Sequence, residues 1–342
     1  MFKKIVAILL AIAAALAIWR HDLVLYGLSQ GKGQLNIILS AKPVEKYLDD
    51  PQFPNSLKGK IRLIHEIRDF AVDSLGLKGA KNYEKMFDQQ GKPVLWVVTA
   101  SHPFKLQAKE WRFPVFGSFS YKGFFNYERA KKELASLQEA GLDASVREVN
   151  GWSTLGWLRD PILSEMLERD AGDLADLIIH ELTHTTIYIR DSVRFNENLA
   201  TFVGGAGAEM FLEMKYGPGS EELRTYLSKR EDRNRFAAYV LAGAGCLDSL
   251  YRTFDDEWSL ERKKEMKDSA ISQFIAALDT VKFNDRSRYA DRFKDFRPDN
   301  TYFLSFMRYR SNVDDIQRLC DERFGGDLKL MIGYFREHFR SL

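Results

Sequence analysis

The chain has 342 residues, of which 45% are hydrophobic, and it carries 50 basic and 48 acidic side chains. This length allows one large domain or two modest ones, with enough apolar residues for a proper core. The formal net charge of +2 gives no field suited to nucleic acid as a partner, and two widely separated cysteines exclude a CxxC redox pair and a dense disulfide framework.

The N-terminal segment has the pattern of a secretory signal. Lys3 and Lys4 precede an uninterrupted apolar run from Ile5 to Trp19, which is short for a membrane span of about 17–25 residues. We expect residues 1–22 to be a signal peptide or an uncleaved membrane anchor; a buried apolar helix of a cytosolic protein is the alternative. The lysines favour an N-terminus left in the cytoplasm. The body would then be exported to the cell envelope, either as a periplasmic protein or attached to the membrane.

Residues 23–160 predict an N-terminal α/β part. β-Branched and aromatic residues cluster at the expected strands, and helical periodicity marks the segments between them. The predicted helices are 43–49, 57–76 and 127–140, and the predicted strands are 94–99, 115–121 and 145–149, with a further edge strand at 151–157.

Residues 161–342 predict a helical part. Beyond the helices discussed next, apolar periodicity predicts helices at 236–254, 259–281, 302–309 and 328–339. The fold class predicted for the whole chain is therefore α+β and mainly α, with a small mixed β-sheet packed on a helical body.

One pentapeptide of this helical part carries metal chemistry, namely His180-Glu181-Leu182-Thr183-His184. Residues four apart on an α-helix lie on nearly the same face, so both imidazoles can bind one zinc ion while Glu181 reaches water on that metal. The alternative is a helix whose two histidines are simply buried and hydrogen-bonded. Two buried imidazoles beside a carboxylate would carry a heavy desolvation cost without a cation.

A catalytic zinc ion needs a third protein ligand and an open position for water. Glu197 is the predicted ligand, because residues 190–194 form a tight connection and a second helix from Phe195 can run back along the first. Ala200, Thr201 and Gly204 share the face of Glu197, and such small side chains let two helices approach closely. The alternative for Glu197 is an ordinary solvated helix charge.

The motif with its downstream Asn196-Glu197 and Ala200 resembles the gluzincin metallopeptidases, and the chain resembles the bacterial predicted aminopeptidase family over most of its length after the N-terminal segment. Other segments that carry this resemblance include Gly33-Gln34-Leu35, Ser120-Tyr121, Ser153-Thr154-Leu155-Gly156-Trp157 and Asn300. The resemblance implies a gluzincin-like helical body and hydrolysis of peptide bonds. The interval before Glu197 is shorter than in thermolysin-like gluzincins, so their substrate pockets do not transfer in detail.

These observations predict an exported, zinc-dependent aminopeptidase with a peptide substrate. Zn²⁺ would be held by His180, His184 and Glu197, and Glu181 would act as the general base. An endopeptidase of the same mechanism is the alternative within this class. A membrane-tethered binding protein with a structural or vestigial zinc site is the alternative from another class.

The resemblance also implies supporting roles around the metal. Gluzincins use a tyrosine or histidine from a later helix to stabilise the oxyanion, and Tyr309 is the predicted residue, with Tyr188 as the second choice. Asn196 and Thr201 would orient the ligands. Gly156 would lie on a strand that pairs with the substrate backbone.

An aminopeptidase must also hold the free α-amino group of its substrate, and a carboxylate usually does so. Glu209 and Asp160 are both candidates from the sequence.

Overall fold

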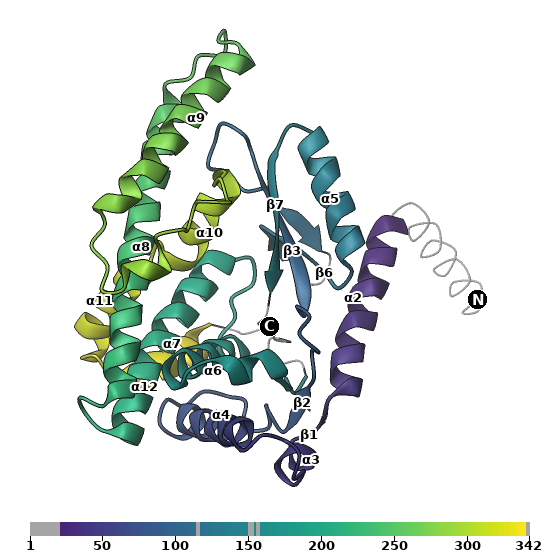
Figure 1. Cartoon of the computed structure of the whole chain (residues 1–342), viewed down its shortest axis with the longest axis vertical. Helices are drawn as coiled ribbons and strands as arrows, with labels where there is room; N and C mark the ends of the chain where they lie inside the picture. Colours follow the sequence, from purple (N-terminus) through teal and green to yellow (C-terminus); the bar gives the residue numbers. More distant parts are fainter. Residues whose placement is uncertain (1–20, 114–116, 150–153, 155–157, 340–342) are drawn as a thin grey trace, which may run out of the picture.

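The computed structural model describes residues 21–113, 117–149, 154 and 158–339. It confirms the α+β, mainly helical fold class. Figure 1 shows a central sheet of β3, β6 and β7, with α5 and α2 to one side and the long helices α8 and α9 to the other. The predicted N-terminal apolar run and Gly156 lie outside the described residues. Within the part that is described, no helix is both long and apolar enough to cross a membrane.

Among the residues that the structure describes, the strands form three small sheets, and only the first mixes parallel and antiparallel pairs. The sequence predicted a single mixed sheet. The first contains β1 (Lys42–Pro43), β2 (Lys85–Phe87) and β8 (Ile162–Leu163). The second is antiparallel, in the order β6 (Lys122–Phe124), β3 (Leu95–Ser101) and β7 (Asp143–Val149). The third pairs β4 (Trp111–Phe113) with β5 (Gly117–Phe119).

Alternation along β3 and β7 gives the second sheet two different faces. Val98 and Ala144 pack with Leu137 of α5 (Tyr127–Glu139) in a small apolar cluster. On the opposite face, the Ser145 hydroxyl hydrogen-bonds to Thr301 at 2.7 Å. This second face therefore meets α10 (Asn300–Arg310), which carries the predicted Tyr309.

The helices of the body follow one another with short connections. In the first half of the chain these are α2 (His21–Ser40), α3 (Glu45–Leu48) and α4 (Asn55–Asp73). After β8 come η1 (Ser164–Glu168), α6 (Ala171–Thr186), α7 (Val193–Tyr216), α8 (Glu221–Arg252), α9 (Leu260–Ala277), η2 (Leu278–Thr280), η3 (Arg286–Arg288), α10, α11 (Val313–Phe324) and α12 (Leu328–His338).

Three of the helices extend or add to the prediction. α8 begins at Glu221 rather than at 236, because the Ser220 side chain caps its N-terminus and Tyr226 packs into the core, although residues 221–235 are too polar to show apolar periodicity. α2 and α11 were not predicted. α2 has a polar and glycine-containing sequence, so its apolar face is interrupted.

The largest core lies around α6 and α7. It includes Ile64 of α4, Ile178 of α6, Val203 of α7 and Met331 of α12. This core draws residues from both sides of position 160, and the division into parts at 23–160 and 161–342 stays a prediction. A second cluster, which includes Phe274, joins α8, α9 and α10.

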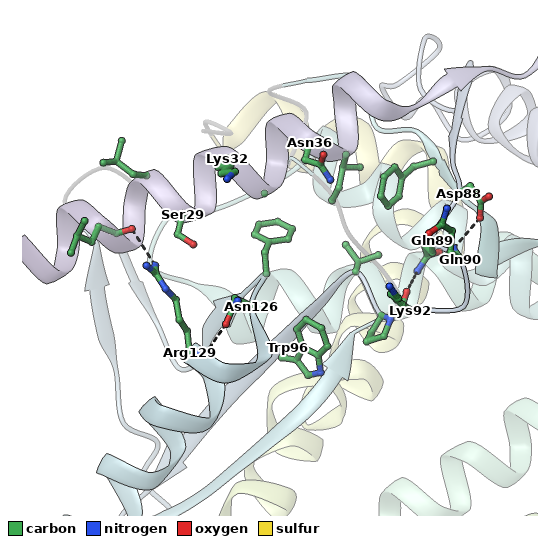
Figure 2. Close-up of a pocket in the computed structure, with 18 residues that line it drawn as sticks. Ser29, Lys32, Asn36, Asp88, Gln89, Gln90, Lys92, Trp96, Asn126 and Arg129 are labelled. Atoms are coloured by element: carbon green, nitrogen blue, oxygen red, sulfur yellow. Dashed lines mark hydrogen bonds between the residues drawn. The ribbon is translucent and has the colours of Figure 1, made fainter.

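Helix α2 packs tightly against Phe125 at Gly33, and a cavity lies beside this contact. A Cβ atom added at Gly33 would lie 2.2 Å from Cγ of Phe125, so only glycine fits there. Beside this contact is a cavity of about 860 Å³. Figure 2 shows Lys32 and Asn36 of α2 on one side of it, with Trp96 and Arg129 on the other. None of the three predicted metal ligands lines this cavity.

We predict that Gly33→Ala weakens the attachment of α2. The added methyl group overlaps the Phe125 ring, and overpacking of this kind costs about 1–3 kcal/mol. The matched control is Gly31→Ala on the same helix, where a Cβ atom meets nothing within 4 Å. Limited proteolysis and thermal melting should show earlier cleavage near α2 and a lower Tm for Gly33→Ala alone. Identical behaviour of the two variants would show that the contact does not hold α2.

Candidate active site

Helix α6 carries three of the predicted site residues. The Asp170 side chain caps its N-terminus by accepting a hydrogen bond from the Asp173 backbone N–H at 2.9 Å. Leu174, Ile178 and Leu182 are completely buried on one face of the helix. The helix is therefore held firmly by its apolar face, and the His180 side chain remains 18% exposed.

A short connection returns the chain to α7. Asn196 closes this connection, because its side-chain amide accepts a hydrogen bond from Ile189 N at 2.9 Å and donates one to Ile189 O at 2.7 Å. Asp191 adopts a left-handed backbone conformation at the bend, with φ of 58°. A tight connection is thus confirmed, but it runs over residues 187–192 rather than 190–194, because α6 ends at Thr186 and α7 already begins at Val193. Asn196 bonds to the backbone of this connection.

The two helices approach closely at Gly204. A Cβ atom there would lie 2.8 Å from the Asp176 backbone oxygen and 3.2 Å from Cβ of His180. Any side chain larger than hydrogen would push α7 away from α6 at the level of His180. The expectation that small residues on this face allow a close approach is therefore confirmed for Gly204.

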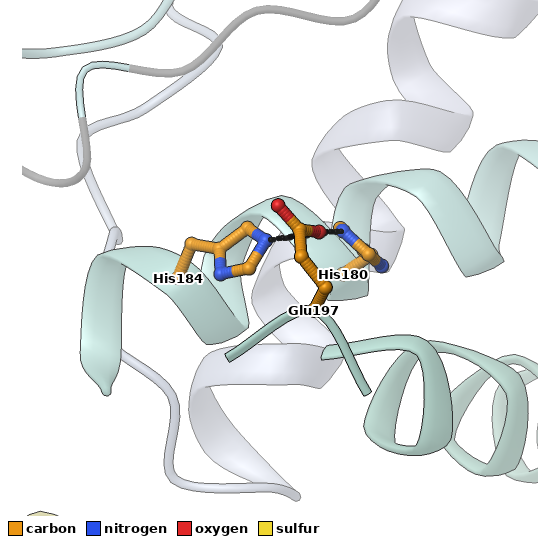
Figure 3. A group of neighbouring side chains, drawn as sticks. All are labelled: His180, His184 and Glu197. Carbon is orange, nitrogen blue, oxygen red and sulfur yellow. Dashed lines mark hydrogen bonds and ion pairs between the residues drawn. The ribbon is translucent and has the colours of Figure 1, made fainter. Parts of the chain in front are cut away.

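His180, His184 and Glu197 meet between these helices, and Figure 3 shows the Glu197 carboxylate between the two imidazole rings. The Nε2 atoms of the histidines are 3.1 Å apart, and Glu197 Oε2 lies 3.5 Å from His180 Nε2 and 3.3 Å from His184 Nε2. Ligand atoms about 2.0–2.1 Å from a tetrahedral zinc ion are about 3.3–3.4 Å apart. The three atoms therefore have the spacing that such a site requires.

The carboxylate of Glu197 and the neighbouring imidazoles stabilise each other's charged forms. Burial opposes ionisation of Glu197, but the adjacent His184 and His180 bring the pKa of its carboxyl well below the usual range. Burial likewise opposes the charged form of His180, yet hydrogen bonding to Glu197 and the nearby carboxylates of Glu181 and Asp176 raise its pKa. The pocket thus favours a carboxylate together with positive charge, which a metal cation would also supply.

In the part of the chain that the structure describes, the second ring nitrogen of His184 lacks the hydrogen bond that is usual for histidines that bind metals. Histidines that bind metals generally donate their second ring N–H to a carboxylate or a carbonyl. His184 Nδ1 is buried and has no hydrogen-bond partner among the described residues. The ring instead packs edge-on against Tyr188, with centroids 6.0 Å apart.

Three tyrosines surround Glu197. Burial and then the Glu197 carboxylate raise the pKa of Tyr309 to about 12. The same two causes, in the same order, raise the pKa values of Tyr188 and Tyr121. All three side chains therefore remain neutral phenols near Glu197. Tyr309 and Tyr188 were expected here from the sequence, whereas Tyr121, in the turn between β5 and β6, was not assigned a role.

A fourth tyrosine lies near Glu181. Tyr83 is 1% exposed and has a positive φ of 67°. Burial raises its pKa, and the carboxylates of Glu181 and Asp160 raise it further. Asp160 and Glu181 are thus both near this phenol. Nothing in the local sequence distinguished Tyr83 from a core residue.

Asn198 is another residue that the sequence did not single out. It is completely buried, and its Nδ2 donates hydrogen bonds to the carbonyls of Arg194 and Arg308, each at 2.7 Å. Its Oδ1 accepts a hydrogen bond from Asn312 N at 2.9 Å. The residue next to Glu197 therefore fixes the end of α10 against α7.

Thr201 and Glu209 lie farther along α7. Thr201 lines a cavity of about 180 Å³ together with Asp176 and Arg310. Glu209 is twelve positions beyond Glu197, or about 18 Å at 1.5 Å per residue, and it pairs with Arg230 at 2.7 Å. Glu209 therefore lies about three helical turns from Glu197 and does not join the group of His180, His184 and Glu197.

Comparison with known proteins assigns a family. A family model described as "Putative aminopeptidase" matches residues 25–337, which include every residue of the site above. No curated protein and no solved structure matches the chain.

We predict that Gly204→Ala weakens zinc binding, because the added methyl group forces α7 away from Asp176 and His180. Changes beside metal ligands cost about 10–100-fold in affinity, and we expect a loss in this range by competition with a chromogenic chelator. Gly205→Ala is the matched control, since its Cβ atom would lie at an ordinary 3.4 Å from Arg230. Equal affinities in both variants would show that helix spacing does not limit the site.

Proposed function

Because this chain belongs to the putative aminopeptidase family, we propose that it is a zinc-dependent peptidase that removes residues from the N-terminus of peptides. The family supports peptidase activity. The observation that carries the zinc dependence is the spacing of 3.1–3.5 Å among two imidazole nitrogens and one carboxylate oxygen.

The residues present fit a zinc ion. Two nitrogen donors and one carboxylate oxygen form the ligand set of many catalytic zinc sites, which leave a further position open for water. When bound there, zinc would supply Lewis-acid polarisation of the scissile carbonyl and would lower the pKa of water. A structural zinc site would usually have four protein ligands, and the group of described residues contains three.

Glu181 is the proposed general base. It lies next to His180 on α6 and is only partly buried, so its carboxylate is accessible to water. In this proposal Glu181 accepts a proton from the attacking water and then passes it to the leaving amine. The amine departs neutral, and Glu181 returns to its ionised form.

The neutral tyrosines are the proposed oxyanion donors. A phenol whose pKa is raised keeps its proton and can donate a hydrogen bond to negative charge that develops on the carbonyl oxygen. Tyr309 is our first choice because it lies on α10 in the Asn300 segment that resembles the family, and because it is near enough to Glu197 for that carboxylate to raise its pKa. Tyr121 and Tyr188 are the further candidates.

The acidic side of the site is the proposed location of the substrate amino group. Asp160 is 2% exposed and accepts two hydrogen bonds from Thr154, at 3.0 Å from N and 2.7 Å from Oγ1. Together with Glu181 it places negative charge near Tyr83. A protonated α-amino group would be attracted to this side.

Export to the cell envelope is also part of the proposal. Lys3 and Lys4 followed by an apolar run to Trp19 support it. If that segment is retained, it would attach the protein to the membrane, with the peptidase body outside the cytoplasm.

We predict that Glu181→Gln and His180→Ala separate metal binding from catalysis. Glu181→Gln should keep one zinc ion per chain and lose about 10²–10⁴-fold in kcat, the contribution typical of a general base. His180→Ala should lose both zinc and activity. Metal analysis of the purified proteins combined with a peptide-library digest gives both readouts, and the product termini distinguish removal of N-terminal residues from internal cleavage. Full activity of Glu181→Gln would remove the proposed base.

A further inference from the structure

Arg308 is a buried cation that lacks an anionic partner. The side chain lies in the last turn of α10, and the residue is 6% exposed. Its Nε and Nη2 donate hydrogen bonds to Oγ and the carbonyl oxygen of Ser120, at 3.1 and 3.3 Å. Its Nη1 is buried and has no hydrogen-bond partner, and no carboxylate pairs with it, anywhere in the described part of the chain. Buried guanidinium groups are normally paired with carboxylates, because burial of an unpaired charge is costly.

The guanidinium group lies beside the candidate site. Asn198, the neighbour of Glu197, donates a hydrogen bond to the Arg308 carbonyl and so fixes this turn of α10 to α7. The Arg308 guanidinium stacks over the ring of Tyr121, 5.3 Å from its centroid. Tyr121 is also close enough to Glu197 for that carboxylate to raise its pKa. Arg308 and the ligand Glu197 thus share Tyr121 as a neighbour.

Opposite charges therefore lie near different tyrosines of the candidate site. The carboxylates of Asp160 and Glu181 raise the pKa of Tyr83, whereas the Arg308 guanidinium stacks on Tyr121, which also lies near Glu197. A short peptide has the same polarity, with an ammonium group at one end and a carboxylate at the other. Because the side chain of Asn198, the neighbour of Glu197, reaches the Arg308 carbonyl, Arg308 lies close to the proposed ligand Glu197. Extended chains of two to four residues span only about 7–14 Å at 3.3–3.6 Å per residue.

We propose that the free Nη1 of Arg308 binds the C-terminal carboxylate of the substrate, so that the preferred substrates are peptides of two to four residues with a free C-terminus. This inference rests on the proposed peptidase function. Arg308 would be a binding residue that sets substrate length, because only a short peptide can place its carboxylate at α10 while its first peptide bond lies at the metal ligands. An arginine is suited to this role, since its planar guanidinium matches the geometry of a carboxylate.

The test compares tri-alanine with tri-alanine amide, which differ only in the terminal charge. For the zinc-loaded wild-type protein we expect kcat/KM to be about 10–100-fold higher for the free acid, the loss typical when a charge-assisted hydrogen bond is removed. Arg308→Gln should abolish this preference, so that its kcat/KM values for the two peptides become equal. Arg310→Gln is the matched control on the same helix, since Arg310 bonds to Asn234 of α8, and it should keep the preference.

A binding measurement separates this inference from the peptidase function. Calorimetry with zinc-loaded Glu181→Gln protein should show tighter binding of the free acid than of the amide, whether or not the wild-type protein turns over these peptides. Equal binding and equal kcat/KM for the two peptides would overturn the role of Arg308 and leave the peptidase proposal intact. Preferential binding without any hydrolysis would support Arg308 and contradict the peptidase proposal. If Arg308→Gln does not fold, the two-peptide comparison on the wild-type protein still decides.

Discussion

The close packing of α6 against α7 at Gly204 is the constraint on which the site depends. His180 and His184 come from one helix and Glu197 comes from the other, so the ligand spacing of 3.1–3.5 Å exists only while the helices stay in contact. Helices usually pack about 8–10 Å apart, and the shorter distances require small residues at the crossing. A glycine against the Asp176 backbone meets this requirement. Buried apolar residues on both helices then hold the pair in a rigid core.

Two asparagines extend this constraint to the rest of the site. Asn196 and Asn198 flank Glu197 on the chain, and their side chains hydrogen-bond to backbone groups rather than to solvent. Asn196 ties α7 to the connection that follows α6, and Asn198 ties α7 to α10. Satisfied buried amides of this kind specify one arrangement of neighbouring segments, because any shift leaves donors and acceptors unpaired. The position of Glu197 is thereby linked to that of Tyr309, and a displacement of α10 would also displace Glu197 relative to His180 and His184.

Local spacing predicted the centre of the site, and long-range contacts determined the rest. The HExxH pattern places two histidines on one helical face whatever the tertiary structure, and the tight connection follows from the short interval before Glu197. Tyr83, Tyr121 and Arg308 carry no such signal, because each reaches the site from a distant element whose position depends on packing. The same reason explains α8, whose polar first half is helical through its cap and through contacts of Tyr226. Asn196 was expected near the ligands from its sequence neighbour, but its bonds to Ile189 could be seen only in the structure.

The charges buried around Glu197 suggest why such an arrangement is retained. A carboxylate and two imidazoles in one group, with a buried guanidinium on the neighbouring Tyr121, are expensive to desolvate, and the contacts among the described residues compensate them only in part. His184 Nδ1 and Arg308 Nη1 have no partner there. Selection for stability alone would favour apolar residues at these positions, because buried ion pairs can often be replaced by apolar residues without loss of stability. Their presence is understandable if a cation and an anionic ligand complete the pocket, since binding energy would then offset the desolvation that folding leaves uncompensated. The side chains would then already have the arrangement that a bound cation and a bound anion require. The packed helices α6 and α7 would keep this arrangement in the absence of both ligands.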